Sequence, residues 1–292
     1  MRRAVVVASG LALLGAASAI SATWGRDATG DAAASLGGAR VLVVDALFLR
    51  AEALRMDGRA DEVPPIYRRI LELDPGSDAA IDFLADVEAH DLLGLAPSPE
   101  ARVRWWSEAS DLVAQGLRKN PRSARLHWRA AELLLHVPER EPAVAARLEA
   151  DRRDRKLEAL RLLAEAARLS EDIPRLGFLH LDELTRLAPR LAAERLAALA
   201  PRAQVDECLA LGREVLRLRE DALSQFFFDD RPAGPLPAVL VLRGGLALVG
   251  NVRDFLEASP PRRADARGLL DAYVAAVGKD PVASALEPLL AR

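Results

Sequence analysis

Cysteine, aromatic residues and surplus positive charge are all scarce in this 292-residue sequence. A single cysteine, Cys208, excludes an internal disulfide, and a chain of this length can form a core without one. Aromatic residues make up 4% of the chain, and the formal net charge is -3, with acids and bases mixed along the sequence. Because no basic surplus is present to neutralise phosphates, nucleic acid is excluded as the main ligand.

Runs of β-branched residues are also scarce, which argues against a β-sheet. The sequence is instead dominated by alanine, leucine and arginine, which are strong helix formers. Hydrophobic residues at 51% and charged residues at 28% are typical of a folded chain. We therefore predict an all-α fold.

The N-terminus carries the longest uncharged stretch, from Ala4 to Gly25, directly after Arg2 and Arg3. Its length is sufficient for a membrane-spanning helix, and Trp24 lies where an interfacial anchor is expected. The small residues Ala17-Ser18-Ala19 also fit the cleavage site of a secretory signal peptide. Three alternatives stay open: an uncleaved anchor, a cleaved signal and a plain buried helix. In the first two the rest of the chain is exported and lies extracytoplasmically, bound to a membrane or secreted.

A helical phrase occurs three times in the first half of the chain. It consists of Glu, a small or aliphatic residue, three variable residues, a large apolar residue, two variable residues and another small or aliphatic residue. A repeated helix of this kind buries its apolar face only by stacking on its neighbours. The three copies are Glu62-Val63-x3-Tyr67-x2-Ile70, Glu108-Ala109-x3-Val113-x2-Gly116 and Glu158-Ala159-x3-Leu163-x2-Ala166.

Glycine, proline and serine divide this half of the chain into helices. Gly58 is expected to end the first helix, since glycine adopts the left-handed cap conformation without strain. Asp74-Pro75 and Asn120-Pro121 are expected to end the helices that carry the first two copies of the phrase, with Ser77 and Ser123 capping the helices that follow. We also expect interruptions at Val137-Pro138 and Glu141-Pro142, and a break between 151 and 156. Further helices are expected near 99–119, 174–188, 190–199, 203–225, 237–256, 262–278 and 281–291.

These features resemble tetratricopeptide repeats, in which helix pairs cross at small residues and a turn ends in Asp or Asn followed by Pro. The resemblance covers about residues 44–170. It implies that Ala51, Ala85 and Ala131 allow close packing of the first helices, and that Ala109 and Ala159 do so in the second helices. The phrase recurs after 46 residues (Glu62 to Glu108) and 50 residues (Glu108 to Glu158), against about 34 in the family. Insertions at 91–103 and 137–153 account for the difference.

A shorter resemblance concerns the start of the repeat region. Leu36-Gly37-Gly38, the segment from Val44 to Ala51 and Gly58-Arg59 are similar to the opening of a group of bacterial membrane-anchored repeat proteins. The implied organisation is an anchor or signal segment over 1–25, a linker over 26–38, helical repeats over 39–170 and a C-terminal helical region over 171–292. The expected architecture is an irregular solenoid of helical hairpins.

The residue types that carry chemistry do not form a recognisable set. The four histidines, His90, His127, His136 and His180, lack the i, i+4 spacing of a helical metal site, and Cys208 lies among apolar residues. We predict a buried core thiol at Cys208, a partly buried His127 bonded to backbone, and no metal or cofactor. A non-catalytic protein-interaction scaffold follows, with no small-molecule substrate expected.

The candidate docking surface is a groove lined by the first helices of the pairs, with two neighbouring tryptophans at one edge. One of these tryptophans is expected to leave the core unless both are buried between the paired helices. Two other functions stay open: a secreted helical hydrolase or lyase with its active site in the concave face, and a structural spacer without a specific ligand. The residues predicted to face a protein or peptide partner are Arg50, Asp82, Glu88, Trp105, Trp106 and Arg129.

Overall fold

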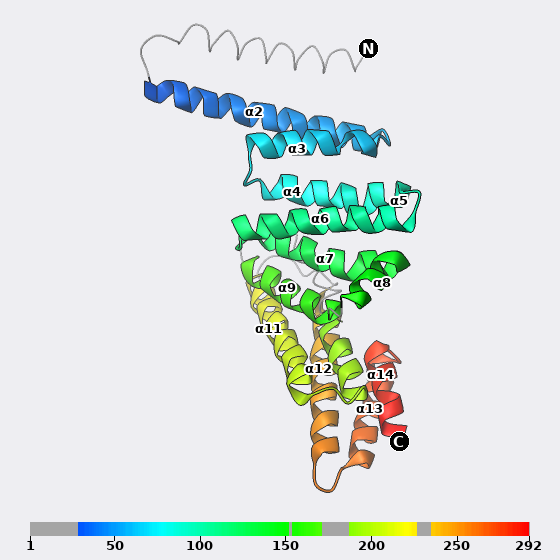
Figure 1. Ribbon diagram of the computed structural model, residues 1–292. Coiled ribbons are helices and arrows are strands. Elements are labelled where there is room, and N and C mark those ends of the chain that lie inside the picture. Colours follow the sequence, from blue (N-terminus) through cyan, green and yellow to red (C-terminus); the bar gives the residue numbers. More distant parts are fainter. Residues whose placement is uncertain (1–28, 152–153, 171–186, 227–234, 292) are drawn as a thin grey trace. The chain divides into compact units, whose positions relative to one another are not determined.

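The computed structural model describes residues 29–151, 154–170, 187–226 and 235–291, and this part of the chain is almost entirely helical and contains no strand (Figure 1). The prediction of an all-α fold is confirmed for these residues. A 3-10 turn, η1 (Ala60–Glu62), and a π-helical segment, η2 (Val87–Leu92), accompany the α-helices. A further helix covers 187–197. The α-helices are α2 (Thr29–Met56), α3 (Pro64–Leu73), α4 (Asp78–Asp86), α5 (Leu93–Leu95), α6 (Pro99–Lys119), α7 (Ala124–Arg140), α8 (Pro142–Ala150), α9 (Arg155–Leu169), α11 (Arg202–Phe226), α12 (Pro235–Glu257), α13 (Arg263–Val277) and α14 (Pro281–Ala291).

The chain divides into two compact units, Met1–Val87 and Glu88–Arg292. In the first unit α2 packs on α3, and α3 packs on α4. In the second unit the packing again follows the order of the chain: α6 contacts α7 and α8, α7 contacts α9, α9 contacts α11, α11 contacts α12, and α13 contacts α12 and α14. Each helix thus buries its apolar face mainly against near neighbours in the sequence, an arrangement compatible with a helical repeat protein.

The first unit is held together by three aromatic rings, one from each of its helices. Phe48 meets Tyr67 edge-on with ring centroids 5.7 Å apart, and Phe83 stacks on Tyr67 at 6.1 Å. Gly58, with φ of 76°, ends α2 as predicted. The amide of Arg59 then donates to Leu54 O at 2.9 Å, and the amide of Gly58 donates to Arg55 O at 3.0 Å, which satisfies carbonyls left free at the helix end.

Two turns, one in each unit, have nearly the same backbone geometry. Asp74 has φ and ψ of -134° and 82°, and Asn120 has -130° and 81°, because the proline that follows each residue excludes the helical conformation. Ser77 and Ser123 each accept a hydrogen bond at 3.3 Å from the amide three residues later. The predicted helix ends and serine caps are therefore confirmed in both places.

These caps give a first testable prediction. We expect Ser123→Ala to lower the free energy of unfolding by about 1 kcal/mol, because the amide of Leu126 loses its acceptor inside the fold. Ser123→Gly should cost only a few tenths of that amount. Urea unfolding followed by circular dichroism measures both, and Ser107→Ala in the interior of α6 is the control that should not destabilise. Equal losses for Ser123→Ala and Ser107→Ala would contradict the cap.

The repeated phrase forms the buried face of its helix in each copy. Tyr67 and Ile70 are buried in α3, Ala109 and Val113 in α6, and the equivalent residues of α9 are Ala159 and Leu163. The alanines expected at the first-helix crossings, Ala51, Ala85 and Ala131, are fully buried as well. The spacing of the phrase therefore predicts the packing side of these helices correctly.

Proline 138 does not interrupt its helix, contrary to the prediction. It lies inside α7, which continues to Arg140. Proline removes the bond that its own amide would make to Leu134 O, and the Arg155 guanidinium donates to that carbonyl instead at 3.4 Å. Pro142 begins α8 as its first residue, where no amide hydrogen is needed.

The predicted break between 151 and 156 is present, because α8 ends at Ala150 and the side chain of Asp154 caps α9 by accepting from the amide of Leu157. The inserted segment is therefore largely helical over its described residues, 137–151. At the other end of the repeat region, α2 begins at Thr29, inside the segment 26–38 for which a linker was predicted.

The C-terminal helices lie close to their predicted positions and enclose one core. Its residues come from α9, helix 187–197, α11, α12, α13 and α14, and they include Leu160, Leu209, Leu246, Leu270 and Leu286. The apolar segment 237–251 falls within α12 and is buried from Leu242 onward on one side. The expected helix 174–188 lies mostly outside the described residues.

The predicted anchor or signal segment over 1–25 also lies outside the described residues. None of the helices in the part of the chain that the structure describes combines the length and the apolar character that a membrane span requires.

Candidate interaction surface

The six residues predicted to face a partner differ widely in exposure. Arg50 is exposed on α2, and Trp105 is partly exposed on α6. The prediction that the whole set faces outward is wrong, because four of the side chains are inside the fold and present little surface to a partner. The buried residues are Asp82, Glu88, Trp106 and Arg129.

The two neighbouring tryptophans take different roles, as their offset on the helix requires. Trp106 is buried, and its indole N–H donates to Leu133 O at 3.0 Å, which ties α6 to α7. Trp105 is only partly buried, and the guanidinium of the exposed Arg104 lies 5.9 Å from the centre of its ring. Trp106 therefore belongs to the core and Trp105 to the surface. The alternative in which both tryptophans are buried is wrong.

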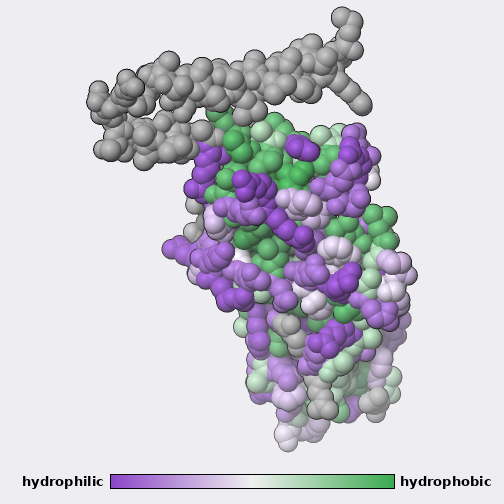
Figure 2. All heavy atoms as spheres, turned by 45° about the horizontal axis from the view of Figure 1, so that its top comes forward, coloured by the Kyte–Doolittle hydropathy of each residue, from purple (hydrophilic) through white to green (hydrophobic). Residues whose placement is uncertain are grey.

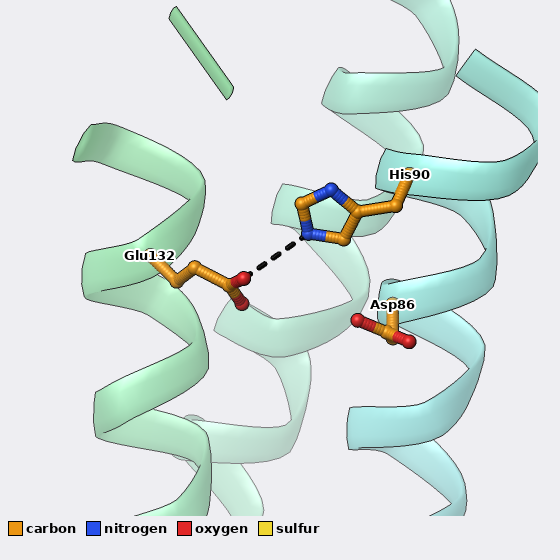
Figure 3. Close-up of side chains that lie close together, drawn as sticks. All are labelled: Asp86, His90 and Glu132. Atoms are coloured by element: carbon orange, nitrogen blue, oxygen red, sulfur yellow. Dashed lines mark hydrogen bonds and ion pairs between the residues drawn. The ribbon is translucent and has the colours of Figure 1, made fainter. Parts of the chain in front are cut away.

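Burial of Arg129 is made possible by charge pairing along α7. Its guanidinium forms an ion pair with Glu132 one turn later and lies 4.9 Å from the centre of the Trp128 ring. The carboxylate of Glu132 also bonds His90 Nε2 at 3.1 Å, drawn as the dashed line in Figure 3. Arg129, Glu132 and His90 thus form a polar network in the second unit. The network cannot be recognised in the sequence, because His90 and Glu132 are 42 residues apart.

A histidine next to a carboxylate is also the chemistry of a metal site. Asp86, the third side chain in Figure 3, lies four residues before His90 in the same run of helix. Asp86 is paired with Arg55 in the first unit at 2.6 Å, and Glu132 is paired with Arg129. Within each unit the carboxylate therefore already has an arginine partner.

The remaining histidines and the cysteine have structural roles where they are described. His127 is partly buried, and its Nδ1 donates to Ser123 O at 2.9 Å, as predicted. His136 lies 3.8 Å from Glu139 on the same helix, and His180 is outside the described residues. Cys208 is fully buried in the C-terminal core, and this burial raises the pKa of its thiol to about 11. The thiol is therefore a core residue and is protonated at neutral pH.

An apolar face of α2 was not predicted as a surface feature. Leu47, Ala51 and Leu54 form the inward side, as their spacing indicated. The opposite side carries Leu42, Ala46, Leu49, Ala53 and Met56, all exposed, which we call the α2 stripe. The sequence signal that could have found it is the alternating spacing of four and three residues, which is typical of a helix that pairs with another helix.

Comparison with known proteins does not assign the chain to a family. No protein-family model matches the sequence, and no curated protein sequence matches it either. Function must therefore be inferred from the residues and contacts described above.

Proposed function

We propose that this protein is a non-catalytic interaction scaffold built from tetratricopeptide-like helical hairpins, acting as an assembly subunit on the extracytoplasmic side of a bacterial membrane. The observation that carries the proposal is the pair of matching hairpin turns at Asp74–Ser77 and Asn120–Ser123. With the phrase residues buried in three helices, these turns support a repeated structural unit. Repeated helix pairs stack into extended surfaces, and such surfaces bind proteins or peptides.

The partner-binding residue that the structure favours is Trp105. A tryptophan side chain that is only partly buried beside an exposed arginine offers a large apolar area and a charge together. Tryptophan and arginine are the residue types most enriched at the energetic centres of protein interfaces. Among the six residues predicted from the sequence, Arg50 is also exposed and can contact a partner. The four buried residues contribute to the packing of the fold instead.

The membrane location rests on the N-terminal sequence. Arg2 and Arg3 followed by the uncharged stretch Ala4–Gly25 favour an export signal or an anchor, with the helical domain on the far side of the membrane. The apolar segment would then hold the scaffold at the membrane or be removed on secretion.

The enzyme alternative is less well supported. A hydrolase or lyase site needs a histidine and carboxylates that are free to act on a substrate. His90 does meet Glu132, but the carboxylates shown in Figure 3 are each engaged by an arginine. The Arg55–Asp86 and Arg129–Glu132 ion pairs instead stabilise charged side chains between packed helices, which is a structural role.

The test is capture of partners by the C-terminally tagged full-length chain from its native membranes in mild detergent, read by mass spectrometry. We expect a stoichiometric envelope protein whose affinity falls about 30-fold in Trp105→Ala, since truncation of an interface tryptophan costs 2 kcal/mol or more. Trp128→Ala is the matched control, because Trp128 is also partly buried beside an arginine. Recovery of the chain alone, or equal losses in both variants, would count against the proposed surface.

A further inference from the structure

The α2 stripe is a row of apolar side chains that are exposed on the surface of the first unit. Leu42, Leu49 and Met56 have 59%, 74% and 80% of their surface exposed, while Ala51 on the opposite side of the helix is fully buried. Figure 2 brings this end of the described chain forward and shows hydrophobic side chains gathered there. Three large apolar side chains in one row are unusual for a surface that faces only water.

The spacing within the stripe is that of a two-helix coiled coil. Successive members are four, three, four and three residues apart, so the leucines and Met56 occupy one core position of a seven-residue repeat and Ala46 and Ala53 occupy the other. The stripe is about 21 Å long, at 1.5 Å per residue. Alanine in alternate layers lets two helix backbones approach closely. The sequence keeps alanine at the same seven-residue interval at positions 39 and 32.

The charges beside the stripe select the partner and its direction. Asp45 and Glu52 flank one side, Arg50 flanks the other, and all three are exposed. If a second α2 lies parallel and in register, Asp45 of each copy faces Arg50 of the other, an attractive pair that forms twice. Glu52 faces Asp57 in that arrangement, but Asp57 lies beyond the last residue of α2. In an antiparallel pair Asp45 would face Glu52 and Arg50 would face Arg50, so these flanking charges would repel each other.

We propose that the α2 stripe binds the α2 stripe of a second copy of this chain as a parallel, in-register coiled coil. The apolar rows of the two copies bury each other, and the Asp45–Arg50 pairs fix the direction. This goes beyond the proposed function, because the α2 stripe belongs to the first unit, whereas Trp105, proposed to bind a different protein, belongs to the second. It does not depend on whether the N-terminal segment stays in a membrane, although two anchored chains would present their α2 helices in the same direction.

Disulfide crosslinking of full-length variants that each add one cysteine to the α2 stripe tests both pairing and direction. In a parallel pair each core position meets itself, so Leu42→Cys and Met56→Cys should each form covalent dimers on mild oxidation. In an antiparallel pair neither would, but a mixture of the two variants would crosslink. The native Cys208 does not interfere, because it is fully buried in the second unit.

Val41→Cys is the matched control, since Val41 is 58% exposed but lies off the stripe. We expect at least tenfold less covalent dimer for Val41→Cys than for Leu42→Cys. Equal yields at the two positions would show random collision and overturn the proposal. So would a monomer by analytical ultracentrifugation, crosslinking only in the mixture, or crosslinks to a different protein.

A charge exchange separates pairing from folding. Asp45→Arg should weaken the dimer about tenfold, because two attractive contacts become two repulsive ones. Adding Arg50→Asp to the same chain restores opposite charges and should restore the dimer. If the double variant dimerises no better than Asp45→Arg alone, the assigned direction is wrong.

Discussion

Glu132→Ala is expected to lower the free energy of unfolding by about 3 kcal/mol, the largest effect of any single charge removal considered for this chain. Arg129 is buried, and the Glu132 carboxylate compensates its charge one turn away on α7. Removing that carboxylate takes a countercharge away from a guanidinium in a poorly solvated place, so less of its desolvation cost is offset. His90 loses its bond at 3.1 Å in the same variant.

Two controls make this result specific. Glu139→Ala removes a carboxylate from the same helix, but its side chain is 61% exposed and it should change stability by less than about 0.5 kcal/mol. Arg129→Met combined with Glu132→Leu replaces the pair by apolar side chains of similar volume. That double variant should recover most of the loss, because both members of this ion pair are removed together. Urea unfolding of all variants gives the comparison, and equal values for Glu132→Ala and Glu139→Ala would contradict a buried network.

Gly212→Ala is expected to destabilise the protein by about 1–3 kcal/mol, although alanine is the better helix former. Gly212 lies in α11, where an added Cβ would come within 2.9 Å of the Ala188 Cβ and 2.7 Å of the Leu246 Cδ2. The leucine can rotate, but the methyl of Ala188 sits directly on its helix backbone. Two helices would have to separate, which opens the core that they share with α12.

The matched control has the opposite expected sign. Gly268 lies in α13, is exposed, and has nothing within 4 Å of an added Cβ. Gly268→Ala should therefore stabilise the protein by about 0.5–1 kcal/mol through its helix propensity. Thermal unfolding of the two variants distinguishes them by direction. If both variants stabilise, α11 does not approach its neighbours as closely as described.

Local signals in the sequence predicted the helices well. The segment 99–119 begins at a proline after Ser98 and ends before Asn120-Pro121, and α6 has these bounds. Its limits depend on capping groups within a few residues, so no distant contact is needed to find them. Pro138 was misjudged because the effect of a proline depends on what else can bond the carbonyl that it frees. That partner, Arg155, lies 17 residues further on (155 − 138).

The candidate site was harder to predict for the same reason. Arg129 and Asp82 were predicted to face outward from the first helices of their pairs, but both are buried. Whether a charge can be buried depends on partners that the fold brings near, such as Glu132 for Arg129. The spacing of Trp105 and Trp106 did predict that their directions differ, but only the contact with Leu133 shows which one points inward.

The two matching turns also have a consequence for how much the lengths of the helices in this chain can vary. Each reversal of direction is specified by four neighbouring residues, Asp74 to Ser77 and Asn120 to Ser123. The helices on either side of each turn can therefore be lengthened or shortened by whole helical turns without a change in the turn that joins them. The insertions predicted at 91–103 and 137–153 lie outside these two turns. Two hairpins of this kind can therefore differ in helix length, and what they share is the geometry of the turn rather than a constant spacing.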